Sequence, residues 1–143
     1  MASMSRRTLI EETVRRRIHE GDVLEGLTGS HVVVQGVNGR GLSLREGPRQ
    51  AWRPLSWECL QLAVEYLSHG RWVNTNLPRR SIAREKRLPS CLRTFLHTKD
   101  CLKGLDADWV ARILFVAGIA DIDTGPPERV RLEPAFLAEM RTN

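Results

Sequence analysis

The feature that most constrains the fold is a pair of strand-like segments on either side of Asn38-Gly39. The run from Val32 to Val37 is rich in β-branched residues, and the segment from Arg40 to Arg45 follows the Asn-Gly pair directly. Asn-Gly supplies the positive φ angles of a type I′ turn, whose twist matches that of the flanking strands. The pattern predicts a β-hairpin with a two-residue loop and a buried face made of Val33, Val37, Leu42 and Leu44. Because an isolated hairpin is only marginally stable, we expect a third strand nearby, over 50–53.

Three helices are predicted by apolar residues that recur at helical spacing, each followed by a glycine that can end it. The first covers about 8–20 and begins with a capping box formed by Thr8 and Glu11. The second opens at Ser56, and the third covers 106–117 and is apolar over most of its circumference. We expect the two halves of the chain to meet through an apolar set made of Leu60, Val64, Leu67, Trp72, Trp109 and Ile113.

The C-terminal part contains a second hairpin signal. Segments 119–123 and 129–133 are rich in strand-forming residues and flank the Thr124-Gly125-Pro126-Pro127 turn. A further short strand is predicted over 71–73. The fold class is therefore α+β, with an N-terminal helix and β-hairpin lobe over 1–55 packed on a helical half over 56–143 that ends in a small hairpin. The two parts form either separate lobes or one continuous domain.

The positive charge of the chain is concentrated in one segment. The whole chain has a formal net charge of +5, yet the segment from Arg71 to Lys99 contains eight basic residues and one acidic residue, Glu85. The basic residues are Arg71, Arg79, Arg80, Arg84, Lys86, Arg87, Arg93 and Lys99. A charge this localised is typical of a surface that binds a polyanion such as nucleic acid. An acidic protein partner and a solvated loop are the alternatives.

The middle of this segment has the pattern of two short helices joined by a turn. Ser81 and Ser90 can cap the helices, and Ile82-Ala83 and Leu92-Arg93 occupy apolar and basic positions within them. Over 81–96 the chain resembles winged helix-turn-helix domains. The resemblance implies a winged-helix-like C-terminal half with a recognition helix over 90–98. It also implies base-edge contacts by Arg93, Thr94 and His97, and phosphate contacts by Arg79, Arg80, Arg84, Lys86 and Arg87.

Four tryptophans are many for 143 residues. Trp57 and Trp109 occupy core positions of predicted helices. Trp52, in contrast, lies close to two arginines, Arg49 and Arg53, so it is a candidate to stack on a base or to anchor a protein partner.

No complete catalytic motif is present, so we expect a protein that is not an enzyme and needs no cofactor. Cys91, His97 and Cys101 are close in sequence, but the absence of a Cys-x-x-Cys pair argues against zinc. Three cysteines without a framework spacing favour reduced thiols in a cytoplasm, as in a bacterial or phage protein. The segment 1–19 lacks the continuous apolar core of a secretory signal, and the longest apolar window, 109–122, is interrupted by charges. No membrane association is expected.

These observations predict a small cytoplasmic protein that binds nucleic acid, as a regulator or as a subunit of a larger nucleoprotein assembly. The alternative is an adaptor that binds an acidic protein partner. Its contacts would include Trp52 and the C-terminal segment from Asp100 to Asn143, which has eight acidic residues against five basic ones.

Overall fold

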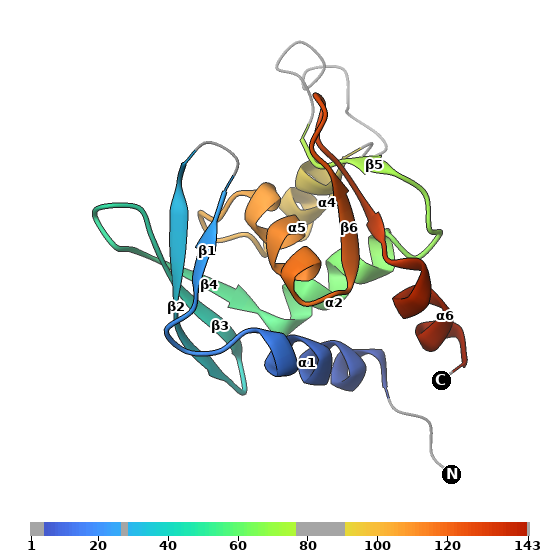
Figure 1. The fold of residues 1–143 in the computed structure, drawn as a ribbon, viewed down its shortest axis with the longest axis horizontal. Helices are drawn as coiled ribbons and strands as arrows, with labels where there is room; N and C mark the ends of the chain where they lie inside the picture. The colour runs from blue at the N-terminus through green and yellow to red at the C-terminus, as the bar shows by residue number, and fades with distance from the viewer. Residues whose placement is uncertain (1–4, 27–28, 77–90, 143) are drawn as a thin grey trace.

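The N-terminal sheet is built around the predicted hairpin. In the computed structural model, which describes residues 5–26, 29–76 and 91–142, this sheet has four strands in the order β1-β2-β3-β4 (Figure 1). The strands are β1 (Val23–Glu25), β2 (His31–Asn38), β3 (Gly41–Glu46) and β4 (Ala51–Ser56), and all neighbours are antiparallel. Strand β4 confirms the predicted third strand. Strand β1 was not predicted, because three residues are too few to show an alternating pattern.

The turn of the hairpin differs from the prediction. Asn38 pairs with Gly41, so the loop consists of Gly39 and Arg40, and neither Asn38 nor Gly39 takes a positive φ. Instead, the Asn38 side-chain oxygen accepts a hydrogen bond from the Arg40 backbone N–H at 2.8 Å. Gly41, with φ of 146°, takes the conformation that favours glycine. The type I′ turn predicted at Asn38-Gly39 was therefore wrong.

The strand register also differs, and this changes which valine is buried. Val34 pairs with Leu44 and Gly36 with Ser43, so Gln35 is an extra residue on β2 and forms a bulge. The buried positions of the hairpin are Val32, Val34, Leu42 and Leu44. Val33 was predicted on this face but is only half-buried, because the shifted pairing places it opposite Arg45.

Helix α1 (Arg6–Arg17) is capped three residues earlier than predicted. Its N-cap is Ser5, whose hydroxyl oxygen accepts a hydrogen bond from the Thr8 N–H at 3.1 Å. The predicted capping box at Thr8 was therefore wrong. The apolar stripe was predicted correctly, since Leu9, Ile10, Val14 and Ile18 are all buried.

Three helices lie between the two sheets (Figure 1). They are α2 (Trp57–Tyr66), α4 (Leu92–Thr98) and α5 (Ala107–Val116). Helix α2 has the predicted N-cap, because the Ser56 hydroxyl accepts a hydrogen bond from the Cys59 N–H at 3.1 Å. Of the apolar set expected to join the two halves, all but Trp72 are buried, and Trp72 is half-buried.

The second sheet contains the predicted C-terminal hairpin. Its strands are β5 (Val73–Asn74), β6 (Ala120–Asp123) and β7 (Arg129–Leu132), in the order β5-β7-β6. The hairpin does not end the fold, however, because helix α6 (Pro134–Thr142) follows it and buries Phe136 and Met140. The prediction of a terminal hairpin was wrong in this respect. The spacing of four residues between Phe136 and Met140 was the signal for α6.

Helix α5 is central to a hydrophobic core that includes residues of both sheets and of every described helix. We expect Leu114→Ala to lower the free energy of unfolding by about 2–5 kcal/mol, because Leu114 is fully buried and its loss leaves a cavity. Phe115→Ala is the control, since Phe115 is the next residue and is 43% exposed; its loss should cost less than about 1 kcal/mol. Urea denaturation measures both. Equal stabilities of the two variants would contradict the placement of α5.

Candidate nucleic-acid interface

All five predicted phosphate contacts lie outside the described residues, namely Arg79, Arg80, Arg84, Lys86 and Arg87. The structure does describe both flanks of that segment. Asn74 and Cys91 form a parallel bridge, and the Arg93 N–H donates a hydrogen bond to the Thr75 carbonyl oxygen at 3.0 Å. The described residues on the two sides of that segment therefore lie next to each other, at the beginning of α4.

Helix α4 presents two of the three predicted base-contacting residues to solvent. Arg93 and His97 are exposed and lie four residues apart, hence on the same face of the helix. Thr94 is half-buried, and its hydroxyl lies 3.0 Å from the Sγ of Cys91, the N-cap residue. The adjoining face of α4 buries Leu92 and Leu96 in the core. Arg93 and His97 are thus available to a ligand, whereas Thr94 is engaged in capping the helix.

The loop that follows α4, from Lys99 to Lys103, carries two more cations. The ammonium group of Lys99 lies 5.5 Å from the ring centroid of Phe95, which stacks on Tyr66 at 4.5 Å. The Lys103 ammonium group is 3.4 Å from a carboxylate oxygen of Asp100, and all three charged side chains are exposed. We call this segment the Lys99–Lys103 loop.

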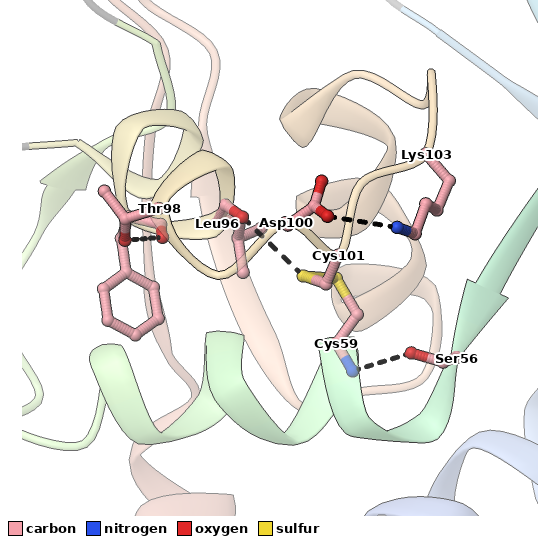
Figure 2. Close-up of a disulfide and its surroundings, with 8 residues drawn as sticks. Ser56, Cys59, Leu96, Thr98, Asp100, Cys101 and Lys103 are labelled. Atoms are coloured by element: carbon pink, nitrogen blue, oxygen red, sulfur yellow. Dashed lines mark hydrogen bonds and ion pairs between the residues drawn. A yellow bond between two sulfur atoms is a disulfide. The ribbon is translucent and has the colours of Figure 1, made fainter.

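A disulfide bond between Cys101 and Cys59 fastens the Lys99–Lys103 loop to α2 (Figure 2). The prediction of three reduced thiols was therefore wrong for this pair, and only Cys91 among the three cysteines is free. Spacing alone does not reveal such a pairing, since the two cysteines are 42 residues apart. The bond also engages one sulfur of the Cys91, His97 and Cys101 set, and the described residues contain no cluster of three potential metal ligands.

A groove of about 490 Å³ separates the Lys99–Lys103 loop from strands β3 and β4. We call it the Trp52 groove. Its apolar lining comes from Leu42, Pro54, Leu55 and Leu62. Its charged lining comes from Arg40, Glu58, Lys99, Asp100 and Lys103. The groove thus combines an apolar surface with three cations and two carboxylates.

Trp52 lines this groove and is the exposed tryptophan that the sequence singled out. Its side chain is 55% exposed, and its indole N–H donates a hydrogen bond to the Ser43 hydroxyl at 2.8 Å. This bond fixes the orientation of the ring on the sheet. Of its two neighbouring arginines, Arg49 is exposed in the β3–β4 turn, and Arg53 forms an ion pair of 3.0 Å with Glu46. Neither arginine lines the groove.

A second depression, of about 320 Å³, lies on the other side of the same loop. Arg93, His97, Asp100, Lys103 and Asp106 line it, together with the apolar residues Leu102 and Leu105. The Lys99–Lys103 loop is therefore a ridge bordered by two depressions, each of which contains cations and carboxylates. The sequence identified Arg93, His97, Lys99 and Trp52 separately, and the fold gathers them around this ridge. The sequence did not identify Arg40 and Lys103, because these two residues come close to the others only in the folded chain.

The cations of the second sheet are in a different situation. Arg129 forms an ion pair with Asp123, and Arg131 forms one of 3.4 Å with Asp121. The guanidinium groups of both arginines lie over the ring of Trp72, at 5.5 and 4.5 Å from its centroid. The hydrogen bond from Arg129 lowers the pKa of the Asp123 carboxyl below its usual range. Both arginines are paired within the sheet, whereas Arg40, Arg93 and Lys99 at the ridge have no carboxylate partner within 4 Å among the described residues, so the ridge is the better candidate for an anionic ligand.

Comparison of the chain with family models, curated proteins and solved structures found no match. Within the described part of the chain, no helix combines the length and apolar character needed to cross a lipid bilayer. The resemblance to winged helix-turn-helix domains remains a prediction.

Proposed function

We propose that the protein is a non-enzymatic nucleic-acid-binding protein, a regulator or a subunit of a nucleoprotein assembly, that contacts its ligand through the ridge. The observation that carries this proposal is the gathering of cations around an exposed aromatic ring. Arg40 comes from the hairpin turn and Lys99 and Lys103 from the loop after α4, yet all three line the groove that also contains Trp52. Phosphates are neutralised by such cations, and bases stack on such rings.

The second depression extends this surface toward α4. Arg93 and His97 add a cation and a hydrogen-bonding imidazole, and both belong to the part of the basic segment that the structure describes. In the winged-helix-like form of the proposal, α4 is the recognition helix, and Arg93 and His97 face base edges in a major groove. The ridge then contacts the neighbouring phosphates.

The proposal predicts a loss of affinity that is independent of nucleotide sequence when the ridge cations are neutralised together. In the triple variant Arg40→Gln, Lys99→Gln, Lys103→Gln, we expect weaker binding to every oligonucleotide. The slope of log affinity against log salt concentration should fall by about 0.7–0.9 for each lost phosphate contact. Fluorescence anisotropy of a labelled oligonucleotide across a potassium chloride series measures both quantities.

A matched control removes the same formal charge elsewhere. Arg6, Arg16 and Arg141 are exposed residues of α1 and α6, so their replacement by Gln lowers the net charge equally without touching the ridge. This control should retain most of the affinity. Similar losses in the two triple variants would show that only net charge matters. No binding of the folded parent to any nucleic acid at low salt, together with binding to polyglutamate, would overturn the proposal and favour the adaptor for an acidic protein.

A further inference from the structure

We propose that the Trp52 groove accepts an unpaired base, and that single-stranded nucleic acid is therefore the preferred ligand. This inference rests on the proposed function and names the class of ligand. Asp100, Cys101 and Lys103 line one side of the groove and belong to the loop that lies above α2 in Figure 2. Trp52 and Arg40 line the groove from the N-terminal sheet.

The lining of the groove suits a base better than a phosphate. Pro54 and Leu62, both half-buried, provide apolar surface, which a phosphate does not match. The exposed side chains of Glu58 and Asp100 also line the groove; the Glu58 carboxylate would repel a phosphate, and the Asp100 carboxylate is paired with Lys103. The same carboxylates can accept hydrogen bonds from the exocyclic amino groups of a base. A flat ring with amino donors at its edge fits this combination.

Trp52 is held as a stacking platform. More than half of its side chain is exposed, and the hydrogen bond of its indole N–H to Ser43 orders the ring before any ligand arrives. A ring ordered in advance loses little conformational freedom on binding. Stacking of one base on such an aromatic side chain raises affinity by about five- to 150-fold.

The cations lie where the backbone on either side of a stacked base would pass. Lys99 and Lys103 line the groove on the side of the Lys99–Lys103 loop, and Arg40 lines it on the side of the N-terminal sheet. A nucleic-acid strand that crosses the groove with one base inserted would bring the phosphates on either side of that base near the cations on both sides of the groove. In a duplex the faces of the bases are covered by their neighbours, and side chains in the grooves reach only base edges. Only an unpaired base can therefore use Trp52.

The test compares an unstructured single strand with the duplex of the same sequence, using the full chain. The parent should bind the single strand at least about tenfold more tightly than the duplex. We expect Trp52→Ala to weaken single-strand binding by about five- to 150-fold with an unchanged salt slope and little effect on the duplex. Trp52→Phe should restore most of the affinity. Phe115→Ala, at an exposed aromatic residue outside the groove, should change nothing.

Quenching of tryptophan fluorescence gives a second readout. Trp57 and Trp109 are buried, and Trp72 is half-buried with the guanidinium groups of Arg129 and Arg131 over its ring. Quenching by the single strand should therefore come mainly from Trp52 and should be largely lost in Trp52→Phe. If Trp52→Ala binds the single strand as tightly as the parent does, or if the parent prefers the duplex, the inference is wrong while the proposed function stands. If the folded parent binds neither nucleic acid, both are wrong.

Discussion

Replacing Gly41 with alanine is expected to lower the free energy of unfolding by about 3 kcal/mol or more, a large part of the stability of a domain this size. Gly41 has φ of 146°, a conformation that side chains of L-residues rarely adopt. A Cβ at this position would lie 2.7 Å from the Ser56 Cα and closer still to the Leu55 carbonyl oxygen. Both atoms belong to the backbone of β4, so they cannot move aside without breaking the pairing of β3 with β4. Thermal and urea denaturation measure the loss.

Gly39→Ala is the control, two residues away in the same turn. A Cβ on Gly39 meets no atom within 4 Å, and its φ is not positive. We therefore expect a change of less than about 1 kcal/mol in either direction. If Gly39→Ala proves more damaging than Gly41→Ala, the turn has the type I′ geometry that the Asn-Gly pair suggested.

The hairpin shows what the sequence can and cannot predict about this fold. The two strands follow from local preferences, and so do the helices capped by Ser56 and preceded by Asp106. The register of the hairpin does not. It depends on the close approach of Gly41 to a third strand and on the bulge at Gln35, which are long-range features. The predicted pairing was shifted by one residue, and this was enough to assign Val33 to the core instead of Val34.

The candidate site shows the same limit. Charge counting identified Arg93 and Lys99, and the neighbouring Arg49 and Arg53 drew attention to Trp52. No local pattern relates these residues to Arg40, because the turn and the loop after α4 meet only when the sheet packs against the helices. The pairing of Cys59 with Cys101 was equally invisible, although it fixes the loop that carries Lys99 and Lys103. The residue types of the surface were predictable, whereas its shape required the fold.

Trp57 contacts three elements of the N-terminal part at once. It is the first residue of α2, is fully buried, and donates a hydrogen bond from its indole N–H to the Asn38 carbonyl oxygen at 2.8 Å. Its backbone N–H donates to the Arg40 carbonyl oxygen at 3.1 Å. The guanidinium group of Arg15 in α1 lies 5.2 Å from its ring centroid. One side chain thus joins α1, α2 and the hairpin turn.

We expect Trp57→Ala to lower the free energy of unfolding by about 3–5 kcal/mol, because it leaves a large cavity and removes one of the two side-chain donors to the Asn38 carbonyl oxygen, the other being Arg15. Trp57→Phe keeps most of the apolar volume but loses the hydrogen bond, so it should cost less. Trp52→Ala is the matched control, since it deletes the same side chain five residues away where 55% of it is exposed; the expected cost is below about 1 kcal/mol. Urea denaturation of the three variants ranks them. A Trp52→Ala variant as unstable as Trp57→Ala would mean that Trp52 belongs to the core, and it would then be unavailable to stack on a base.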